Sequence, residues 1–431
     1  MSAPWPAALK PGRLQDCRRH KFFVAAGECR ENPLMSKIRW LNRTVLGIGL
    51  ASLFSDWSHE IATAAMPAFL ATLGVAAAWL GIIEGVSDGL SSFAKMASGF
   101  YTDRLQRRKP IAVGGYIVTA VATAAFGFAT NAWHVLLARA TAWFGRGIRT
   151  PVRKALLASS VSREGYGRAF GLERTMDTLG AIVGPLTALV LLQISNYNYR
   201  FLFFCALVPG LAAAAVIAFL VKERERAPVA HISFGERLRL LPKPYRKFLV
   251  GVGLFGAGDF AHTLLILLAT QKLAPTMGVA KAATIAVALY VLHNIFYAGF
   301  SFIAGWFADR LPKNLLLATG YALAGVMALV IIFLPVSVWT FVLVFVFGGI
   351  YVAIEETLED SLCAELVDEA HHGMAFGVLA TVNGLGDFVS SIVVGALWTA
   401  LGTATAFAYS AGLFFLGALI VTQVRPRAQT A

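Results

Sequence analysis

Charge is scarce in this chain of 431 residues. Only 14% of the residues are charged, whereas 57% are hydrophobic. A soluble protein of this size needs far more charge to cover its surface, so the composition excludes an ordinary soluble domain. It indicates an all-α integral membrane protein, because backbone polar groups inside hydrocarbon must bond within their own helix.

Metal, disulfide and nucleotide motifs are also missing. No CxxC or HExxH pattern occurs, so nothing predicts a metal site, and the absence of a P-loop argues against ATP as an energy source. We therefore expect no cofactor. We also expect no structural disulfide, since two cysteines lie in the N-terminal tail and two in or near apolar segments. These are Cys17, Cys29, Cys205 and Cys363.

Long apolar segments dominate what remains. A helix needs about 20 apolar residues to span a bilayer, and the sequence predicts twelve such spans. They lie near 44–73, 77–100, 111–130, 132–159, 166–194, 200–221, 248–272, 278–305, 314–335, 337–365, 374–401 and 403–424.

The distribution of Lys and Arg predicts the orientation. Most of the 37 basic residues fall in the tails and loops on one side, and the loops of the other side hold only Arg200, Lys272 and Lys281. By the positive-inside rule both termini are cytoplasmic. The net charge of +13 is thus mainly a topology signal, and no nucleic-acid partner is expected. We expect a monomer, multi-pass in the inner (plasma) membrane, with the lipid bilayer as its surroundings.

Residues 1–43 read as a cytoplasmic tail that is disordered. Their one apolar patch is too short for the apolar core of a secretory signal. The sequence leaves open whether translation begins at Met1 or at Met35, and we expect residues 1–34 to be dispensable.

The chain repeats itself at an offset of 206 residues. "SGFYTDRL" holds Gly99, Asp103 and Arg104, and "AGWFADRL" holds their counterparts Gly305, Asp309 and Arg310. "GRAFGLERTMDTLG" from 167 matches "GMAFGVLATVNGLG" from 373 in the same register. The repeat predicts two six-helix halves, 44–221 and 248–424, joined by a basic cytoplasmic linker, 222–247, with a tail at 425–431. The linker contains a candidate amphipathic helix near 234–241. Duplicated six-helix halves are a transporter architecture, with the binding site between the halves.

The repeated motif resembles a known family. "GFYTDRLQRRKP" is similar to the loop between the second and third helices of the major facilitator superfamily. "RATAWFGRG" resembles the family's fourth-helix motif, and "GAIVGPLTA" resembles part of its fifth-helix antiporter motif. The matching residues are Gly99, Asp103, Arg104, Arg107 and Arg108 in the first, Arg139, Gly145 and Gly147 in the second, and Gly180, Gly184 and Pro185 in the third. The resemblance implies the twelve-helix fold of that family, with a conformational role for the loop motif in both copies.

Ionisable residues lie within several predicted helices, where a charge costs about 2.5–3.5 kcal/mol at the bilayer centre. Asp56, His59 and Glu60 share one face of 44–73, and Asp259 and His262 repeat the D-x-x-H spacing in 248–272. The resemblance implies that these helices line the central cavity. The residues are candidates for proton coupling or substrate binding, together with Asp88 and Arg139. The competing interpretation is a buried polar network that locks helices together. The same choice, a network or a cavity role, applies to Glu84, Asp88 and Lys95.

The repeat inverts charge between 132–159 and 337–365. Arg149 corresponds to Glu355, Arg153 to Glu359 and Lys154 to Asp360. The resemblance implies that these helix ends face each other, which predicts a cytoplasmic salt-bridge gate. Its candidate members are Arg146, Arg149, Arg153, Glu355, Glu356 and Glu359. Two alternatives stay open: the arginines bind an anionic substrate, or they reach the membrane interface.

These features predict a secondary active transporter that moves a small organic solute by alternating access. Proton coupling and efflux are the favoured details. Alternatives are proton-coupled uptake of an organic anion, a membrane-embedded enzyme, and a solute sensor without flux; we expect no enzyme. The sequence does not identify the substrate.

Overall fold

The computed structural model describes residues 40–75, 78–223, 234–260 and 262–424, and all regular structure in these ranges is helical. The expected tails, 1–43 and 425–431, lie outside the described residues apart from 40–43, and so do Cys17, Cys29 and Met35. The helices begin where the sequence provides caps. Asn42, Asn131, Asn198 and Ser337 each accept a hydrogen bond from a backbone N–H in the first turn of the helix that follows.

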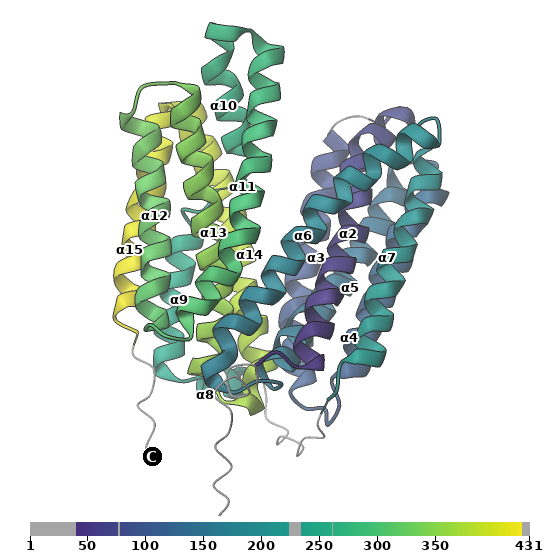
Figure 1. The fold of residues 1–431 in the computed structure, drawn as a ribbon, viewed down its shortest axis with the longest axis vertical. Helices are drawn as coiled ribbons and strands as arrows, with labels where there is room; N and C mark the ends of the chain where they lie inside the picture. The colour runs from purple at the N-terminus through teal and green to yellow at the C-terminus, as the bar shows by residue number, and fades with distance from the viewer. Residues whose placement is uncertain (1–39, 76–77, 224–233, 261, 425–431) are drawn as a thin grey trace, which may run out of the picture. The chain divides into compact units, whose positions relative to one another are not determined.

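The first six spans form one bundle, coloured purple to teal in Figure 1. They are α2 (Arg43–Thr72), α3 (Ala78–Thr102), α4 (Lys109–Ala124) continued by the 3₁₀ turn η2 (Ala125–Phe128), α5 (Ala132–Ala158), α6 (Tyr166–Ile194) after the turn η3 (Arg163–Gly165), and α7 (Tyr199–Leu220). Within this bundle α2 packs against α6 and α7, and α5 packs against α3 and α4.

The remaining spans form a second bundle, green to yellow in Figure 1. They are α9 (Lys243–Gly256), α10 (His262–Met277), α11 (Val279–Ala308), α12 (Lys313–Phe333), α13 (Val338–Leu366), α14 (His372–Leu401) after the turn η4 (Glu369–His371), and α15 (Thr403–Thr422). The short helix α8 (Phe234–Leu240) precedes them, where an amphipathic helix was expected. Gly402, with φ 91°, is the single residue between α14 and α15, a conformation that glycine adopts without strain.

The expected spans match these helices to within a few residues, with one exception. The span 248–272 is wrong as a continuous helix, because it is divided into α9 and α10. Eight of the described helices are long and apolar enough to cross a membrane by length and composition. The long helices α2, α3 and α5 are not among these eight, and each carries charged residues in its middle.

The most extensive contacts between the two bundles are two helix crossings, α3 with α14 and α6 with α11; α5 also contacts α13 and α14, and α6 also contacts α13. Glycines from both helices lie at each crossing, so the backbones approach closely. A Cβ built on Gly377 would lie 2.8 Å from the Lys95 carbonyl oxygen, and one built on Gly171 would lie 2.6 Å from the Ser301 carbonyl oxygen. Gly99 and Gly305 face these crossings from α3 and α11, as expected for the repeated motif.

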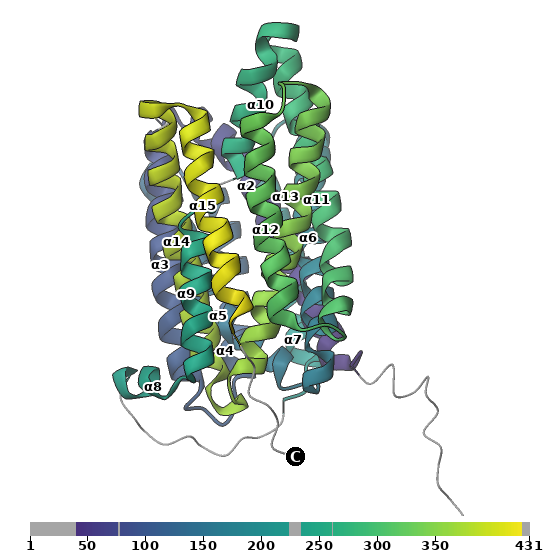
Figure 2. The ribbon, with the colours of Figure 1, turned by 90° about the vertical axis from the view of Figure 1, so that its left-hand side faces the viewer.

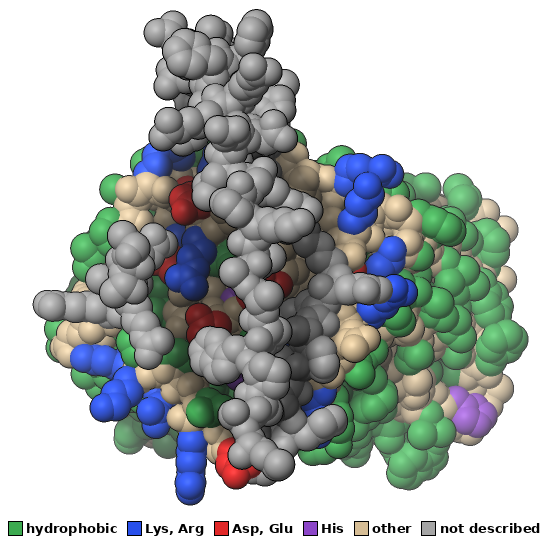
Figure 3. All heavy atoms as spheres, turned by 90° about the horizontal axis from the view of Figure 1, so that it is seen from below, with side chains coloured by type: hydrophobic (Ala, Val, Ile, Leu, Met, Phe, Trp, Pro, Cys, Tyr) green, Lys and Arg blue, Asp and Glu red, His purple; other side chains and the backbone are tan. Residues whose placement is uncertain are grey.

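We call the end of the bundles that carries the loops 103–108 and 309–312 the motif end. It is the lower end in Figure 1, where the bundles come together, while α10 and the start of α11 stand away from α6 at the upper end (Figures 1 and 2). Figure 3 looks onto the motif end and shows Lys and Arg side chains scattered over it, with apolar side chains on the flanks.

Candidate functional site

Two carboxylates join the bundles at the motif end, and we call these contacts the clasps. In the first, the Asp103 carboxylate accepts the backbone N–H groups of Gly373 (2.9 Å) and Met374 (2.7 Å), at the start of α14. In the second, the Asp309 carboxylate accepts those of Gly167 (2.7 Å) and Arg168 (3.2 Å), at the start of α6. A carboxylate is stabilised at a helix N-terminus by unpaired N–H groups and the helix dipole. Each aspartate of the repeated motif thus meets the N-terminus of a helix in the other bundle.

The motif arginines support the clasps from the side. The Arg108 guanidinium donates to the Asp103 carboxylate, and it is buried with it. Arg104 lies over the Phe100 ring at 4.1 Å, and Arg310 lies over Trp306 at 3.5 Å. The duplicated arginines thus stack on aromatic rings, which holds their charge at the motif end.

The glycines of the fifth-helix motif line a different contact, between α6 and α2. A Cβ on Gly180 would lie 3.0 Å from the Trp57 backbone nitrogen, and Gly184 packs on Glu60. Pro185 follows inside α6. These residues set how closely α6 approaches α2 within the first bundle.

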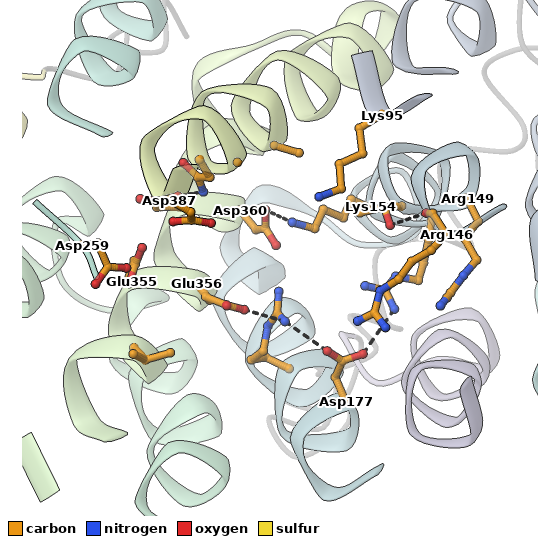
Figure 4. Close-up of a pocket in the computed structure, with 18 of the residues that line it drawn as sticks. Lys95, Arg146, Arg149, Lys154, Asp177, Asp259, Glu355, Glu356, Asp360 and Asp387 are labelled. Carbon is orange, nitrogen blue, oxygen red and sulfur yellow. Dashed lines mark hydrogen bonds and ion pairs between the residues drawn. The ribbon is translucent and has the colours of Figure 1, made fainter. Parts of the chain in front are cut away.

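A cavity of about 470 Å³ lies between the bundles. Residues from α3, α5 and α6 line one wall, and residues from α13, α14 and the segment between α9 and α10 line the other. The lining includes six basic side chains, all from the first bundle, and seven acidic ones, of which six come from the second. Figure 4 shows this separation, with Asp259, Glu355 and Asp387 facing Lys95, Arg146 and Lys154 across the space.

Two ion pairs connect the walls. Lys154 of α5 lies 2.6 Å from Asp360 of α13, and Arg174 of α6 lies 2.5 Å from Glu356. The Lys154–Asp360 pair has opposite charges at matched repeat positions, and this contact is confirmed.

The other two repeat-matched pairs are not formed, so the expected contacts Arg149–Glu355 and Arg153–Glu359 are wrong. Arg149 donates to Ser55 (2.6 Å) and lies over Tyr116, and Arg153 pairs with Glu173 (2.8 Å). Both arginines therefore turn into their own bundle. The reason is helical geometry: Lys154 projects about 100° away from Arg153, which brings one into the cavity and the other against α6.

Exchanging the charges of Lys154 and Asp360 tests this pair. Each single reversal, Lys154→Asp or Asp360→Lys, should lower the melting temperature of the purified protein. Either change places two like charges at this contact, and residue 360 is buried. The double reversal should recover most of the loss. Melting can be followed by tryptophan fluorescence in detergent. A double variant no more stable than the worse single would show that the two side chains do not act as a pair.

Asp56, His59 and Glu60 do not form the expected facing arrangement with Asp259. Asp56 is buried in the first bundle and pairs with Arg146 at 3.1 Å. His59 packs on Trp143 with ring centroids 4.2 Å apart, and its Nε2 lies 3.7 Å from Glu60 Oε1. None of the three lines the cavity.

The acids of α3 divide between two environments. Arg139 donates to both carboxylate oxygens of Glu84 at 2.9 and 3.0 Å and to Thr63, and the Trp143 indole donates to Asp88 at 2.6 Å. These contacts make a polar network inside the first bundle. Lys95, about two helical turns closer to the motif end than Asp88, lines the cavity instead.

Asp259 lies where α9 has ended and α10 has not begun. Its backbone N–H bonds back to Phe255 and Gly256, and its carboxylate accepts the Tyr351 hydroxyl at 3.0 Å. The break thus presents a carboxylate on the cavity wall. His262 is the first residue of α10, and its side chain lies outside what the structure describes.

Three charged residues that line the cavity were not singled out from the sequence: Arg174, Asp177 and Asp387. Asp177 accepts Arg174 at 3.1 Å, and Arg153 lies 3.6 Å from it. The signal for these residues was present, because each is a charged residue within a predicted span and such residues are functional candidates by default.

The chain matches known transporters over nearly its whole length. The profile of the Major Facilitator Superfamily matches residues 48–273 and 248–431. An uncharacterized MFS-type transporter of Methanocaldococcus jannaschii is 27% identical over 383 residues, covering 89% of this chain and 95% of that protein.

Two further comparisons concern a partial relative and a fold neighbour. The multidrug resistance protein MdtH of Escherichia coli O1:K1 is 27% identical over 146 residues, which are 33% of this chain and 36% of MdtH. The solved Escherichia coli fucose:proton symporter FucP superposes with a TM-score of 0.72 at 17% identity, covering 90% of this chain and all of that one. The family profile, the twelve spans and the paired bundles agree, and the chain belongs to the Major Facilitator Superfamily.

Proposed function

We propose that this transporter exports a small organic solute across the inner membrane in exchange for protons. The observation that carries the proposal is the cavity between the bundles, with carboxylates on one wall that form no ion pair within the described residues. Carboxylates in such a position are suited to bind and release protons during transport. Membership of a transporter family sets the enzyme alternative aside.

We propose that the motif end is cytoplasmic, as are both termini. The concentration of Lys and Arg in the tails and in the loops of this end supports the orientation. The conformation described above then has its cytoplasmic end closed by the clasps and by the pairs Lys154–Asp360 and Arg174–Glu356. Opening that end requires these contacts to break.

Asp259 is the better coupling group of the two aspartates predicted for that role. Asp56 already forms an ion pair with Arg146 inside its own bundle and does not line the cavity. Within the part of the chain that the structure describes, the Asp259 carboxylate accepts a hydrogen bond from the Tyr351 hydroxyl and forms no ion pair, and Glu355 stands beside it in Figure 4. We assign Asp56, His59, Glu60, Asp88 and Arg139 to a structural polar network of the first bundle, the alternative weighed for them from the sequence.

Export rather than uptake is supported by the partial fifth-helix antiporter motif and by the partial likeness to MdtH, which is named a multidrug resistance protein. Organic-anion uptake has less support, because the arginines that would bind an anion already have partners. Arg146 and Arg153 pair with acids of their own bundle, and Arg149 lies on Tyr116.

Asp259→Asn tests the coupling. A growth and accumulation screen of a deletion strain against metabolites and drugs would supply the solute. In inverted vesicles with an acidic interior, adding that solute should dissipate the proton gradient. A weak-base dye that is quenched by the gradient should then recover its fluorescence. The variant should lose at least nine-tenths of this response because the amide cannot take up a proton.

The matched control is Asp368→Asn, an exposed carboxylate of the motif end that removes the same charge. It should respond like the unaltered protein. Solute flux with no proton movement in the unaltered protein would contradict the coupling, and solute binding with no flux at all would favour the sensor alternative.

A further inference from the structure

The break between α9 and α10 brings two negative features to the same wall of the cavity. α9 ends at Gly256, so its C-terminal carbonyl groups, which carry partial negative charge, point toward the break. Asp259 lies in this segment. The backbone there is fixed from three directions, since the Ser390 hydroxyl donates to the Asp259 carbonyl, Tyr351 donates to its carboxylate, and the Tyr409 hydroxyl donates to the Ala257 carbonyl at 3.1 Å.

Glu355 extends this negative wall from α13. In Figure 4 its carboxylate stands next to that of Asp259, on the wall opposite the basic side chains of the first bundle. Neither forms an ion pair with any residue in the described ranges. Asp387 of α14 lies on the same wall, with the Lys95 ammonium directed into the space between them (Figure 4).

Most basic side chains of the opposite wall already have an acidic partner. Asp56 lies within 3.1 Å of Arg146, Glu173 and Asp177 lie against Arg153, Asp360 holds Lys154, and Glu356 holds Arg174. Arg149 is buried and its guanidinium lies over Tyr116 at 4.1 Å. The basic wall is thus largely compensated, whereas Asp259 and Glu355 are not.

We infer that the transported solute carries a positively charged amine group, which Asp259 and Glu355 bind together across the helix break. This inference rests on the proposed function, because it treats the cavity as the solute site. An ammonium group offers several donors to the two carboxylates, and its hydrogen bonds to charged acceptors are strong. Phe260 and Val352, which also line the cavity, give the remainder of the solute an apolar surface.

Other occupants fit less well. A metal ion needs several ligands at short distances, and within the described ranges no group of three or more His, Cys, Asp or Glu has a suitable arrangement. An anion would lie against a wall where four of the six basic side chains, Arg146, Arg153, Lys154 and Arg174, already form ion pairs. The cavity of about 470 Å³ is also large for a bare ion and suits a small organic molecule.

Equilibrium binding to the purified full-length transporter tests the inference. The probes are tyramine and putrescine as amine cations, with benzoate and fluorescein as anions. At least one cation should raise the melting temperature saturably. The double variant Asp259→Asn with Glu355→Gln should weaken that apparent affinity at least tenfold. Asp368→Asn should change it less than twofold.

If the double variant is unstable, the single variant Glu355→Gln and calorimetric titration of the unaltered protein replace it. Saturable protection by the anions alone, protection by none of the probes, or equal affinity in the carboxylate variants would each overturn the inference.

These outcomes are separable from those of the proposed function, because binding in detergent needs no gradient. Cation binding without proton movement in vesicles would support the inference and contradict the proton coupling. Proton-coupled flux of an anion would support the coupling and contradict the inference.

Discussion

Gly377→Val should reduce transport at least tenfold, while Gly395→Val on the same helix should leave it nearly unchanged. The Cβ at residue 377 would meet the Lys95 carbonyl oxygen at 2.8 Å and the Gly99 Cα at 3.3 Å. Both are backbone atoms of α3, so the clash is relieved only by moving α14 away from α3. Around Gly395 no atom of the described residues lies within 4 Å of an added Cβ.

The expected magnitude follows from the cost of the clash. Inserting extra atoms at a packed contact costs about 1–3 kcal/mol. In the proposed transport cycle this contact exists only while the motif end is closed, so the cost should shift the conformational equilibrium about 5–150-fold toward the state with this end open. Gly171→Val at the other crossing should act in the same direction, since its Cβ would lie 2.6 Å from the Ser301 carbonyl oxygen.

Cysteine labelling would follow the shift directly. A single cysteine at Ala380, which lines the cavity, can be placed in a protein without its natural cysteines. With an impermeant maleimide, Gly377→Val should increase labelling from the cytoplasmic side, measured in inverted vesicles. Loss of transport without a change in labelling would mean that the crossing does not control which end is open.

Arg153→Met should destabilise the protein more than any other single charge removal proposed here. Arg153 is buried, lies 2.8 Å from Glu173 and 3.6 Å from Asp177, and donates to Ser52 at 2.5 Å. Removing one member of a buried ion pair costs about 3–5 kcal/mol, because the remaining charge is left without compensation. We expect low yields of folded protein and a strongly lowered melting temperature in detergent.

Arg163→Met is the matched control. Arg163 lies 3.9 Å from Asp368 at the motif end, and both side chains are largely exposed. Exposed pairs contribute little, so the melting temperature should be nearly unchanged. Adding Glu173→Gln to Arg153→Met should restore part of the stability, because it removes one of the two stranded carboxylates. Equal melting of Arg153→Met and the control would show that the buried network does not hold α5 to α6.

Much of this protein was predictable from local features of the sequence. Span positions follow from runs of about 20 apolar residues, since the bilayer imposes a length on each helix. The clasps followed from a repeated Gly and Asp one turn apart, because such a pair at a helix end allows a close approach and offers a carboxylate to a neighbouring helix. Both properties depend on residues close together in the chain.

Only the tertiary structure decided which charges meet. Matched repeat positions correctly indicated the contact between Lys154 and Asp360. In contrast, Arg149 contacts Ser55 and Arg153 contacts Glu173, which lie on other helices of their own bundle. Asp56 and Asp259 share a sequence pattern, but Arg146 compensates one and a helix break exposes the other to the cavity. The sequence determined the helices and their repeat, because these depend on hydrophobic length and local spacing. The partners of the buried charges depended on how the helices rotate and cross, which is set by packing among segments far apart in the chain.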